Sequence, residues 1–279
     1  MSAIDKTGIS LAQIVEAIRT DPEEGSILHL VALTYEFDAE QLLNFLFTRP
    51  LFASPKLLKA DQAEMGRIRP VVFYDAAKSR ETNALPPLLE LHPWQSRAFG
   101  CHHSKAYLVV TERSVHLVLG SFNLTRQGLA CNREVLGHFC WPAREGDDAG
   151  DPSLLGDLVR FLETCLGRHA HASAKSALEG IIASLRRRQE ELAREAGGQH
   201  PMQRGTQALV WSGYHAGQTG LERLASLWHA WHPGKEPDSL FAVSPFFDQN
   251  AKDPLARRFL QTFPSLKRLV LATGENFLP

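Results

Sequence analysis

Short apolar runs alternate with amphipathic helical patterns over the first half of the chain. The runs that predict buried strands lie at residues 27–37, 71–74, 105–111, 115–121 and 134–141. Apolar positions at helical spacing predict helices over 9–19 and 39–47, and Pro50 ends the second one. Because strands alternate with helices, this part of the chain is typical of an α/β layer architecture, a sheet flanked by helices.

The next part of the chain has mainly helical patterns. Polar, turn-rich residues 144–152 predict a loop, and helices are predicted over 153–166 and 172–196. The second helix carries a run of three arginines at 186–188, which we interpret as part of a solvated helix face. A strand at 206–211 and a helix with an apolar stripe from Leu221 to Trp231 follow.

A short internal repeat links the two ends of the chain. Residues 31–38 (VALTYEFD) and 239–248 (SLFAVSPFFD) are both apolar strands that lead to a Phe-Asp pair and a predicted helix, and each is followed later by another apolar strand. The repeat predicts two similar halves. We divide the chain into a first half at 1–143, a helical connecting region with one strand at 144–238, and the beginning of a truncated second half at 239–279.

Composition and charge narrow the class of protein. With 44% hydrophobic and 22% charged residues, the 279-residue chain is typical of a globular protein rather than a disordered one. The formal net charge of −1 provides no overall attraction for polyanions, so a nucleic-acid site must be local. The chain has neither a signal-peptide pattern nor an apolar run of 18 residues, which predicts a cytoplasmic protein without a membrane span.

Residues with catalytic chemistry gather between positions 99 and 135. His103 and Lys105 are two apart, as are Ser121 and Asn123, and Glu134 follows Asn132 at the same spacing. Residues two apart on an extended strand point to the same face. Three adjacent strand ends can therefore bring an imidazole, an ammonium, a hydroxyl, an amide and a carboxylate to one point at the edge of a buried sheet.

Such a set can cleave a phosphodiester without a metal ion. An imidazole can attack phosphorus and form a covalent intermediate, while an ammonium and amide donors neutralise the phosphoryl oxygens. We expect no metal and no cofactor, because Cys101, His102, His103 and Cys131 lack the spacing of a zinc site. The alternation places His102 opposite His103, in a structural role, and Tyr35 and Phe37 are predicted to lie in the core.

At these positions the sequence resembles the phospholipase D superfamily. The family's His-x-Lys and Gly-Ser-x-Asn elements are matched by His103-Ser104-Lys105 and Gly120-Ser121-Phe122-Asn123, with Asn132-Arg133-Glu134 in the place of its trailing Asn-x-Glu. The resemblance implies a phospholipase-D-like fold, with a mixed sheet flanked by helices, and hydrolysis of a phosphodiester through a phosphohistidine.

The resemblance also implies roles for individual residues. His103 would be the nucleophile, Lys105, Asn123 and Ser121 would hold the phosphoryl oxygens, and Glu134 would orient a histidine. Arg126 and Arg133 lie near the motif and are candidates for contacts to substrate phosphates, with surface solvation as the alternative.

Two departures from the family pattern affect the function. The position five residues after the motif lysine is Val110 instead of Asp, a change shared with the tyrosyl-DNA phosphodiesterase branch, which favours nucleic acid, and DNA in particular, as the substrate. The chain also has one His-x-Lys where the family uses two, so a second half or a homodimer partner would complete the site. The alternatives are a phospholipid hydrolase or transferase, and a non-catalytic nucleic-acid-binding or scaffold module.

Overall fold

A computed structural model of the chain describes eleven segments. These are residues 11–38, 70–78, 90–94, 102–125, 127–131, 136–142, 151–167, 171–195, 207–210, 219–243 and 255–272. The chain forms two compact units, Met1–Ala208 and Leu209–Pro279. The helix predicted over 39–47 lies outside the described residues.

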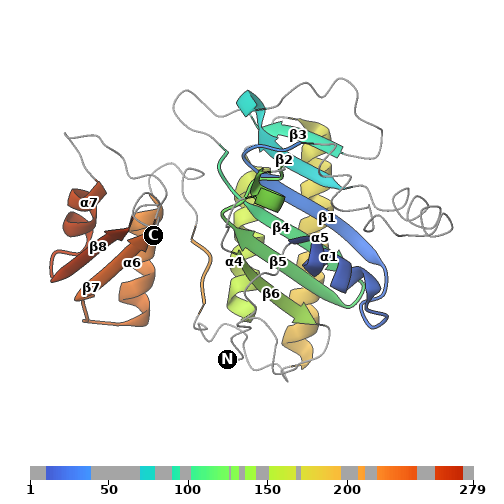
Figure 1. Cartoon of the computed structure of the whole chain (residues 1–279). Helices are drawn as coiled ribbons and strands as arrows, with labels where there is room; N and C mark the ends of the chain where they lie inside the picture. The colour runs from blue at the N-terminus through green and yellow to red at the C-terminus, as the bar shows by residue number, and fades with distance from the viewer. Residues whose placement is uncertain are drawn as a thin grey trace. The chain divides into compact units, whose positions relative to one another are not determined.

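A six-stranded mixed sheet forms the first unit (Figure 1). Its strands are β1 (Ile27–Thr34), β2 (Val71–Asp75), β3 (Glu90–Trp94), β4 (Ala106–Thr111), β5 (Ser114–Gly120) and β6 (Leu136–Pro142). The spatial order is β3-β2-β1-β4-β5-β6. The pairs β1–β2 and β2–β3 are parallel, whereas β1–β4, β4–β5 and β5–β6 are antiparallel. The prediction of a mixed sheet flanked by helices is confirmed.

Strand β3 was not predicted from the sequence, because it contains Pro93. The structure shows why proline is tolerated there: β3 is the edge strand of the sheet and pairs with β2 on one side only. An edge strand does not need every backbone N–H for a ladder. The strand predicted at 206–211 is wrong over its described part, because residues 207–210 have no regular structure.

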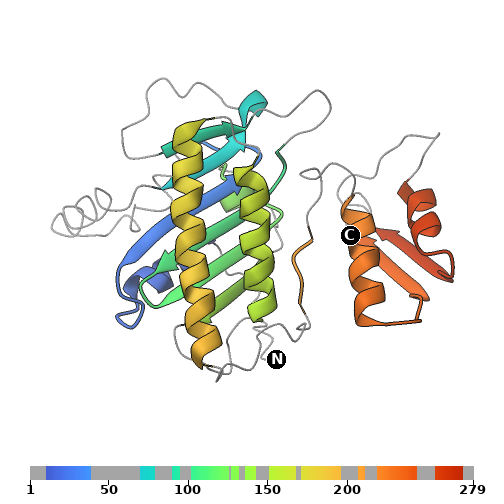
Figure 2. The ribbon, with the colours of Figure 1, turned by 180° about the vertical axis from the view of Figure 1, so that it is seen from behind.

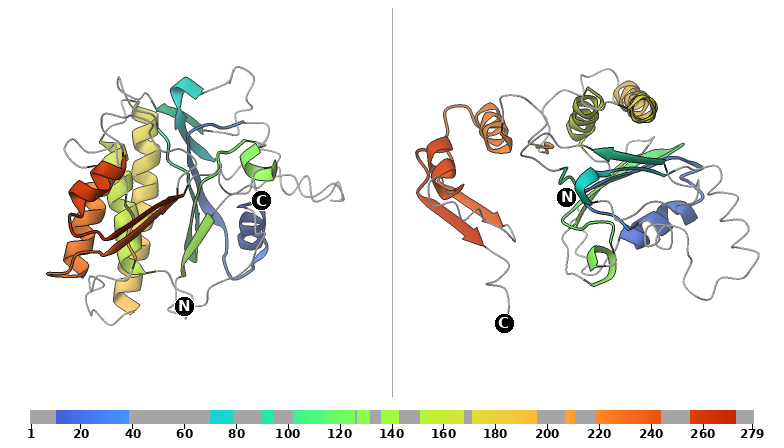
Figure 3. Two further views of the ribbon diagram at one scale, coloured as in Figure 1. Left: turned by 60° about the vertical axis from the view of Figure 1, so that its left-hand side comes forward. Right: turned by 90° about the horizontal axis from the view of Figure 1, so that it is seen from above.

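Helices cover both faces of this sheet. Helices α4 (Pro152–Leu166) and α5 (Ala172–Glu195) cross one face side by side (Figure 2). Helix α1 (Leu11–Thr20) lies on the opposite face (Figure 3, right). Helix α4 begins where the Asp151 carboxylate accepts the Ser153 N–H at 2.9 Å, with Pro152 as its first residue.

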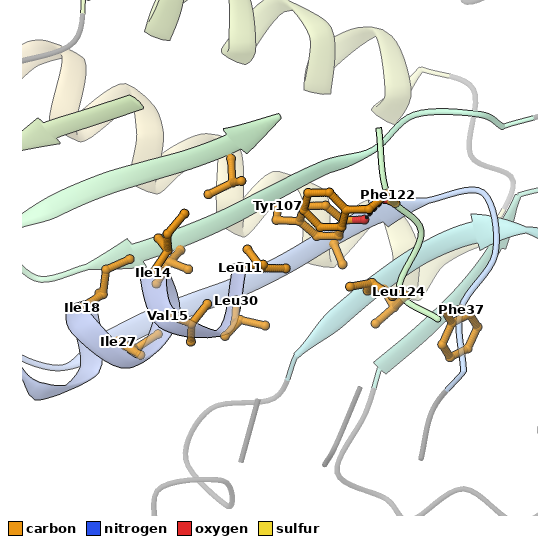
Figure 4. Close-up of a cluster of buried hydrophobic side chains, with 14 of the residues drawn as sticks. Leu11, Ile14, Val15, Ile18, Ile27, Leu30, Phe37, Tyr107, Phe122 and Leu124 are labelled. Carbon is orange, nitrogen blue, oxygen red and sulfur yellow. Dashed lines mark hydrogen bonds between the residues drawn. The ribbon is translucent and has the colours of Figure 1, made fainter. Parts of the chain in front are cut away.

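The hydrophobic core beneath α1 brings together residues from distant parts of the sequence (Figure 4). The apolar stripe of α1, namely Leu11, Ile14, Val15 and Ile18, packs against β1, β4 and β5. The cluster extends to Phe37, Phe122 and Leu124, which lie next to the predicted catalytic residues. Because each such side chain contributes about 1.5–3 kcal/mol when buried, this core holds the site-bearing loops firmly on the sheet.

The arginine run of α5 differs from its predicted solvated face at one position. Arg188 is buried, its Nη2 donates to the Glu112 carbonyl at 2.9 Å, and its Nη1 lies 2.7 Å from Glu191. The guanidinium therefore joins α5 to the turn between β4 and β5. Arg186, by contrast, is exposed and pairs with Glu163 on α4.

A polar cluster with buried Thr111, Ser114 and His116 lies at the end of the sheet near the β4–β5 turn. The Glu24 carboxylate accepts hydrogen bonds from Ser114 and from Thr111, the latter at 2.8 Å, and lies 3.1 Å from His116 Nε2. The His116 Nδ1 is 3.1 Å from His138 Nε2. These contacts join the turn after α1 to strands β4, β5 and β6.

The described residues of the second unit form two parallel strands and two helices. Helix α6 (Gly220–Trp231), strand β7 (Ser239–Val243), helix α7 (Leu255–Thr262) and strand β8 (Arg268–Ala272) follow in order, and β7 pairs with β8. Thr219 and Glu222 form a capping box at the start of α6. Among the described residues of the whole chain, no helix is both long and apolar enough to cross a bilayer.

Candidate active site

Strand register brings the predicted catalytic segments to one edge of the sheet. Leu33 at the end of β1 pairs with Ala106 at the start of β4, and Ala106 pairs with Leu119 near the end of β5. Strand β2 ends beside β1, since Thr34 pairs with Tyr74. The residues just after β1, β2 and β5 therefore meet those just before β4, which include His103 and Lys105.

His103 and Lys105 form the centre of this edge. The Lys105 Nζ lies 3.0 Å from His103 Nδ1 and 3.3 Å from its Nε2. The His103 ring also contacts the Tyr35 ring, with their centroids 4.7 Å apart. Tyr35 was predicted to lie in the core, but it is half-buried and belongs to the site, whereas Phe37 is buried as predicted. His103 is exposed, so a substrate can reach its imidazole.

The surroundings of His103 favour its neutral imidazole. Partial desolvation and then the positive charge of Lys105 lower the pKa of His103, and the Asp75 carboxylate partly opposes this shift. A histidine with a lowered pKa keeps an unprotonated nitrogen at neutral pH, which is the form that can attack an electrophilic phosphorus atom. The electrostatics of the site thus suit a nucleophile.

Asp75, the last residue of β2, connects two segments of the site. It is buried, its Oδ2 accepts the backbone N–H of His102 at 2.7 Å, and its Oδ1 accepts that of Ala77 at 2.9 Å. His102 is buried too, and it stacks on Trp94 of β3, with ring centroids 5.1 Å apart. The opposite orientations predicted for His102 and His103 are confirmed, since the first is buried and the second exposed.

The segment after β5 carries Ser121 and Asn123 and is anchored on both sides. The buried Tyr107 hydroxyl donates to the Phe122 carbonyl at 2.7 Å, and the two rings stack (Figure 4). The Leu124 carbonyl accepts the Asp38 N–H at 2.8 Å. These bonds fix the backbone on either side of Asn123. Strand β5 ends at Gly120, so Ser121 and Asn123 follow the strand instead of lying within it.

The short π-helical segment η2 (Gln127–Cys131) packs closely against Asn123. A Cβ atom on Gly128 would lie 2.4 Å from the Asn123 carbonyl oxygen, so only glycine fits this approach. The Asn123 Oδ1 is buried and has no hydrogen-bond partner within the described segments. A buried polar atom without a partner is uncommon in native structures.

The structure describes four of the seven predicted site residues. His103 and Lys105 are in contact, while Ser121, which is exposed, and Asn123, which is half-buried, lie at the same sheet edge. Glu134, Arg126 and Arg133 lie outside the described residues. Sequence reasoning missed Asp75 and Lys78. An Asp directly after the buried run 71–74 was the available signal for the first.

The described residues contain no group of three or more His, Cys, Asp or Glu side chains arranged to hold a metal ion. The chemistry available from the described part of the site is that of an imidazole, an ammonium, an amide and a hydroxyl. Together these groups can attack phosphorus and neutralise its oxygens.

Comparisons with known proteins find limited similarity. No family model matches the sequence, and no curated protein matches it either. Among solved structures, the crystal structure of yeast tyrosyl-DNA phosphodiesterase matches 64% of this chain at 14% identity, with a TM-score of 0.42. A mutant of the same yeast enzyme matches 57% of the chain at 13% identity, with a TM-score of 0.39. The matched regions cover 37% and 35% of those two chains.

Proposed function

We propose that this chain is a metal-independent phosphodiesterase of the phospholipase D type, acting on nucleic acid and most readily on DNA, as a nuclease or in the processing of DNA ends. The observation that carries the proposal is the exposed His103 imidazole, held 3.0 Å from the Lys105 ammonium at the edge of a buried sheet. Its lowered pKa provides a neutral nucleophile next to a fixed positive charge.

The reaction has two steps. In the first, an imidazole nitrogen of His103 bonds to phosphorus and the bond from phosphorus to the leaving oxygen breaks, while Lys105 and the Asn123 amide hold the non-bridging oxygens. In the second, the oxygen of a water molecule bonds to phosphorus and the phosphorus–nitrogen bond breaks, which releases the phosphate product and restores the imidazole. Ser121 is a further donor to the phosphoryl oxygens.

The leaving oxygen needs a proton that this constellation does not supply. The sequence contains a single His-x-Lys motif, so a second histidine must come from a partner copy or from another polypeptide segment. Glu134 is proposed to orient that histidine, and Arg126 and Arg133 to contact flanking phosphates. The single motif also favours a second candidate function, a nucleic-acid-binding module without catalysis.

The test is hydrolysis in EDTA of labelled single-stranded DNA, duplex DNA and a fluorescent phospholipid. We expect the wild-type chain to cleave DNA when it pairs with a second copy that supplies the proton donor. Cleavage should be lost in His103→Ala and retained in His229→Ala, a matched control at an exposed histidine of the second unit. Because His103 is exposed, its removal should leave the fold intact. Equal rates of cleavage for His103→Ala and the wild type would refute the role of His103 as the nucleophile. Cleavage of the phospholipid alone would show that the substrate is a phospholipid and not a nucleic acid.

A further inference from the structure

Two lysines and the candidate nucleophile surround one aromatic ring at the site. The Lys78 Nζ lies 5.4 Å from the centroid of the Tyr35 ring, and the Lys105 Nζ lies 5.8 Å from the same centroid. The His103 ring is 4.7 Å away. Lys105 belongs to the His-x-Lys motif. Lys78 is the last residue of the 3-10 helix η1 (Ala76–Lys78), directly after β2, and it has no role in the proposed reaction.

One buried carboxylate links the turn that carries Lys78 to the segment that carries His103. Asp75 accepts the backbone N–H of Ala77, next to Lys78, and that of His102, next to His103. Since Asp75 is buried and makes both bonds at once, the turn that carries Lys78 keeps its position relative to the segment that carries His103. Lys78 is thus fixed at the site by backbone contacts, while its side chain is exposed.

The way in which Lys78 is held leaves its charge available. An aromatic face attracts an ammonium through its quadrupole but does not neutralise it, whereas a carboxylate would. Within the segments that the structure describes, Lys78 forms no ion pair. The site therefore presents two ammonium groups around Tyr35, and a single phosphodiester carries one negative charge.

We infer that Lys78 binds a second phosphate, adjacent to the one attacked by His103, so that the ligand of this site is a chain of phosphodiesters such as a nucleic-acid strand. An isolated diester, for example that of a phospholipid, would leave Lys78 without a partner. The inference rests on the proposed function, because it takes the phosphate at His103 and Lys105 as the first of the two.

The test measures binding, so that it can be read whether or not the chain is catalytically complete. The full chain carries His103→Gln to prevent turnover. Its affinity for hexathymidylate with a neutral fluorophore is measured by anisotropy between about 50 and 200 mM salt. We expect Lys78→Ala to weaken binding about fivefold, as for loss of one exposed charge contact. The slope of log Kd against log salt should fall by about 0.7, the value for one phosphate contact to a single strand.

Two controls make the result specific. Lys175→Ala removes an exposed lysine from α5, on the face of the sheet opposite α1, and should change neither affinity nor slope. A second probe keeps one central phosphodiester and has uncharged methylphosphonates at all other positions. With this probe Lys78→Ala should bind like its parent, because the second phosphate no longer carries a charge.

The outcomes separate this inference from the proposed function. If Lys78→Ala leaves the affinity and the salt slope of the His103→Gln parent unchanged, the inference is overturned, even if His103-dependent hydrolysis is found. An equal loss with both probes would also overturn it, because Lys78 would then act on the central phosphate or on the fold. A loss confined to the fully charged probe supports the inference, and it would stand as a binding site even if His103→Ala left hydrolysis unchanged.

Discussion

Removal of the Asp75 carboxylate should destabilise the first unit by at least the amount that follows from its hydrogen bonds to the backbone N–H groups of His102 and Ala77. Hydrogen bonds to a charged group contribute about 1.5–3 kcal/mol each to the free energy of unfolding. If a buried donor is left without a partner, the protein loses that whole contribution. His102 is buried, so its N–H would stay unsatisfied in Asp75→Ala, whereas the exposed Ala77 can be hydrated. We therefore expect a loss of about 3 kcal/mol in Asp75→Ala. Asp75→Asn keeps one acceptor oxygen and should lose about half of that.

Urea unfolding and amide hydrogen exchange provide the assay. The midpoint should fall in Asp75→Ala at an unchanged m-value, and the N–H groups of Ala77 and His102 should exchange faster. Glu179→Ala removes an exposed carboxylate from α5 and should have no effect on either measurement. If Asp75→Ala unfolds at the wild-type midpoint and protects both amides as before, the carboxylate does not hold the two segments together, and the reasoning is refuted.

Asp75→Asn also changes the electrostatics of the site. The Asp75 charge raises the pKa of His103 against the lowering effects of burial and Lys105, so its removal should lower that pKa further. Hydrolysis that needs the neutral imidazole would then persist to lower pH. A pH profile with an unmoved acidic limb would show that His103 is not the titrating group.

Further predictions concern stability and metal dependence. Burial alone would raise the pKa of Glu24, but its hydrogen bonds lower it; burial lowers the pKa of His116. Both groups bind more protons when unfolded, so urea midpoints should fall with acid, from about pH 6.5 through His116 and from about pH 4.5 through Glu24. Because Glu24 raises the pKa of His116, Glu24→Gln should remove only the lower part of this fall. Tyr107→Phe leaves the Phe122 carbonyl unpaired and should cost about 1–2 kcal/mol in the same assay; an unchanged midpoint would contradict this. EDTA should leave DNA cleavage unchanged, and strong inhibition would indicate a metal-dependent reaction.

Much of the fold could be predicted because its signals are local. The apolar runs of β1, β2, β4 and β5 lie at their predicted positions, and so does helix α5. Strand β3 was missed because Pro93 argues against a strand unless its place at the sheet edge is known.

The site was predictable only where its residues are close in sequence. The spacing of His103 and Lys105 was sufficient to place them on one side of the chain and to suggest phosphoryl chemistry. Asp75 contacts a residue 27 positions away, and Lys78 and Tyr35 reach the site through the parallel pairing of β1 with β2. No local pattern encodes such pairings. Apolar Tyr35 therefore resembled a core residue until the strand order placed it beside His103.

The central claim is that His103 forms a covalent bond to phosphorus. The most direct measurement incubates the full chain in EDTA with single-stranded DNA that carries radiolabelled phosphorus at internal positions, followed by a rapid quench in alkali and separation of the protein. We predict a label on the protein that is stable to alkali, is released by acid and is absent from His103→Ala. Cleavage of the DNA without such a label, or the same label on His103→Ala, would contradict the claim.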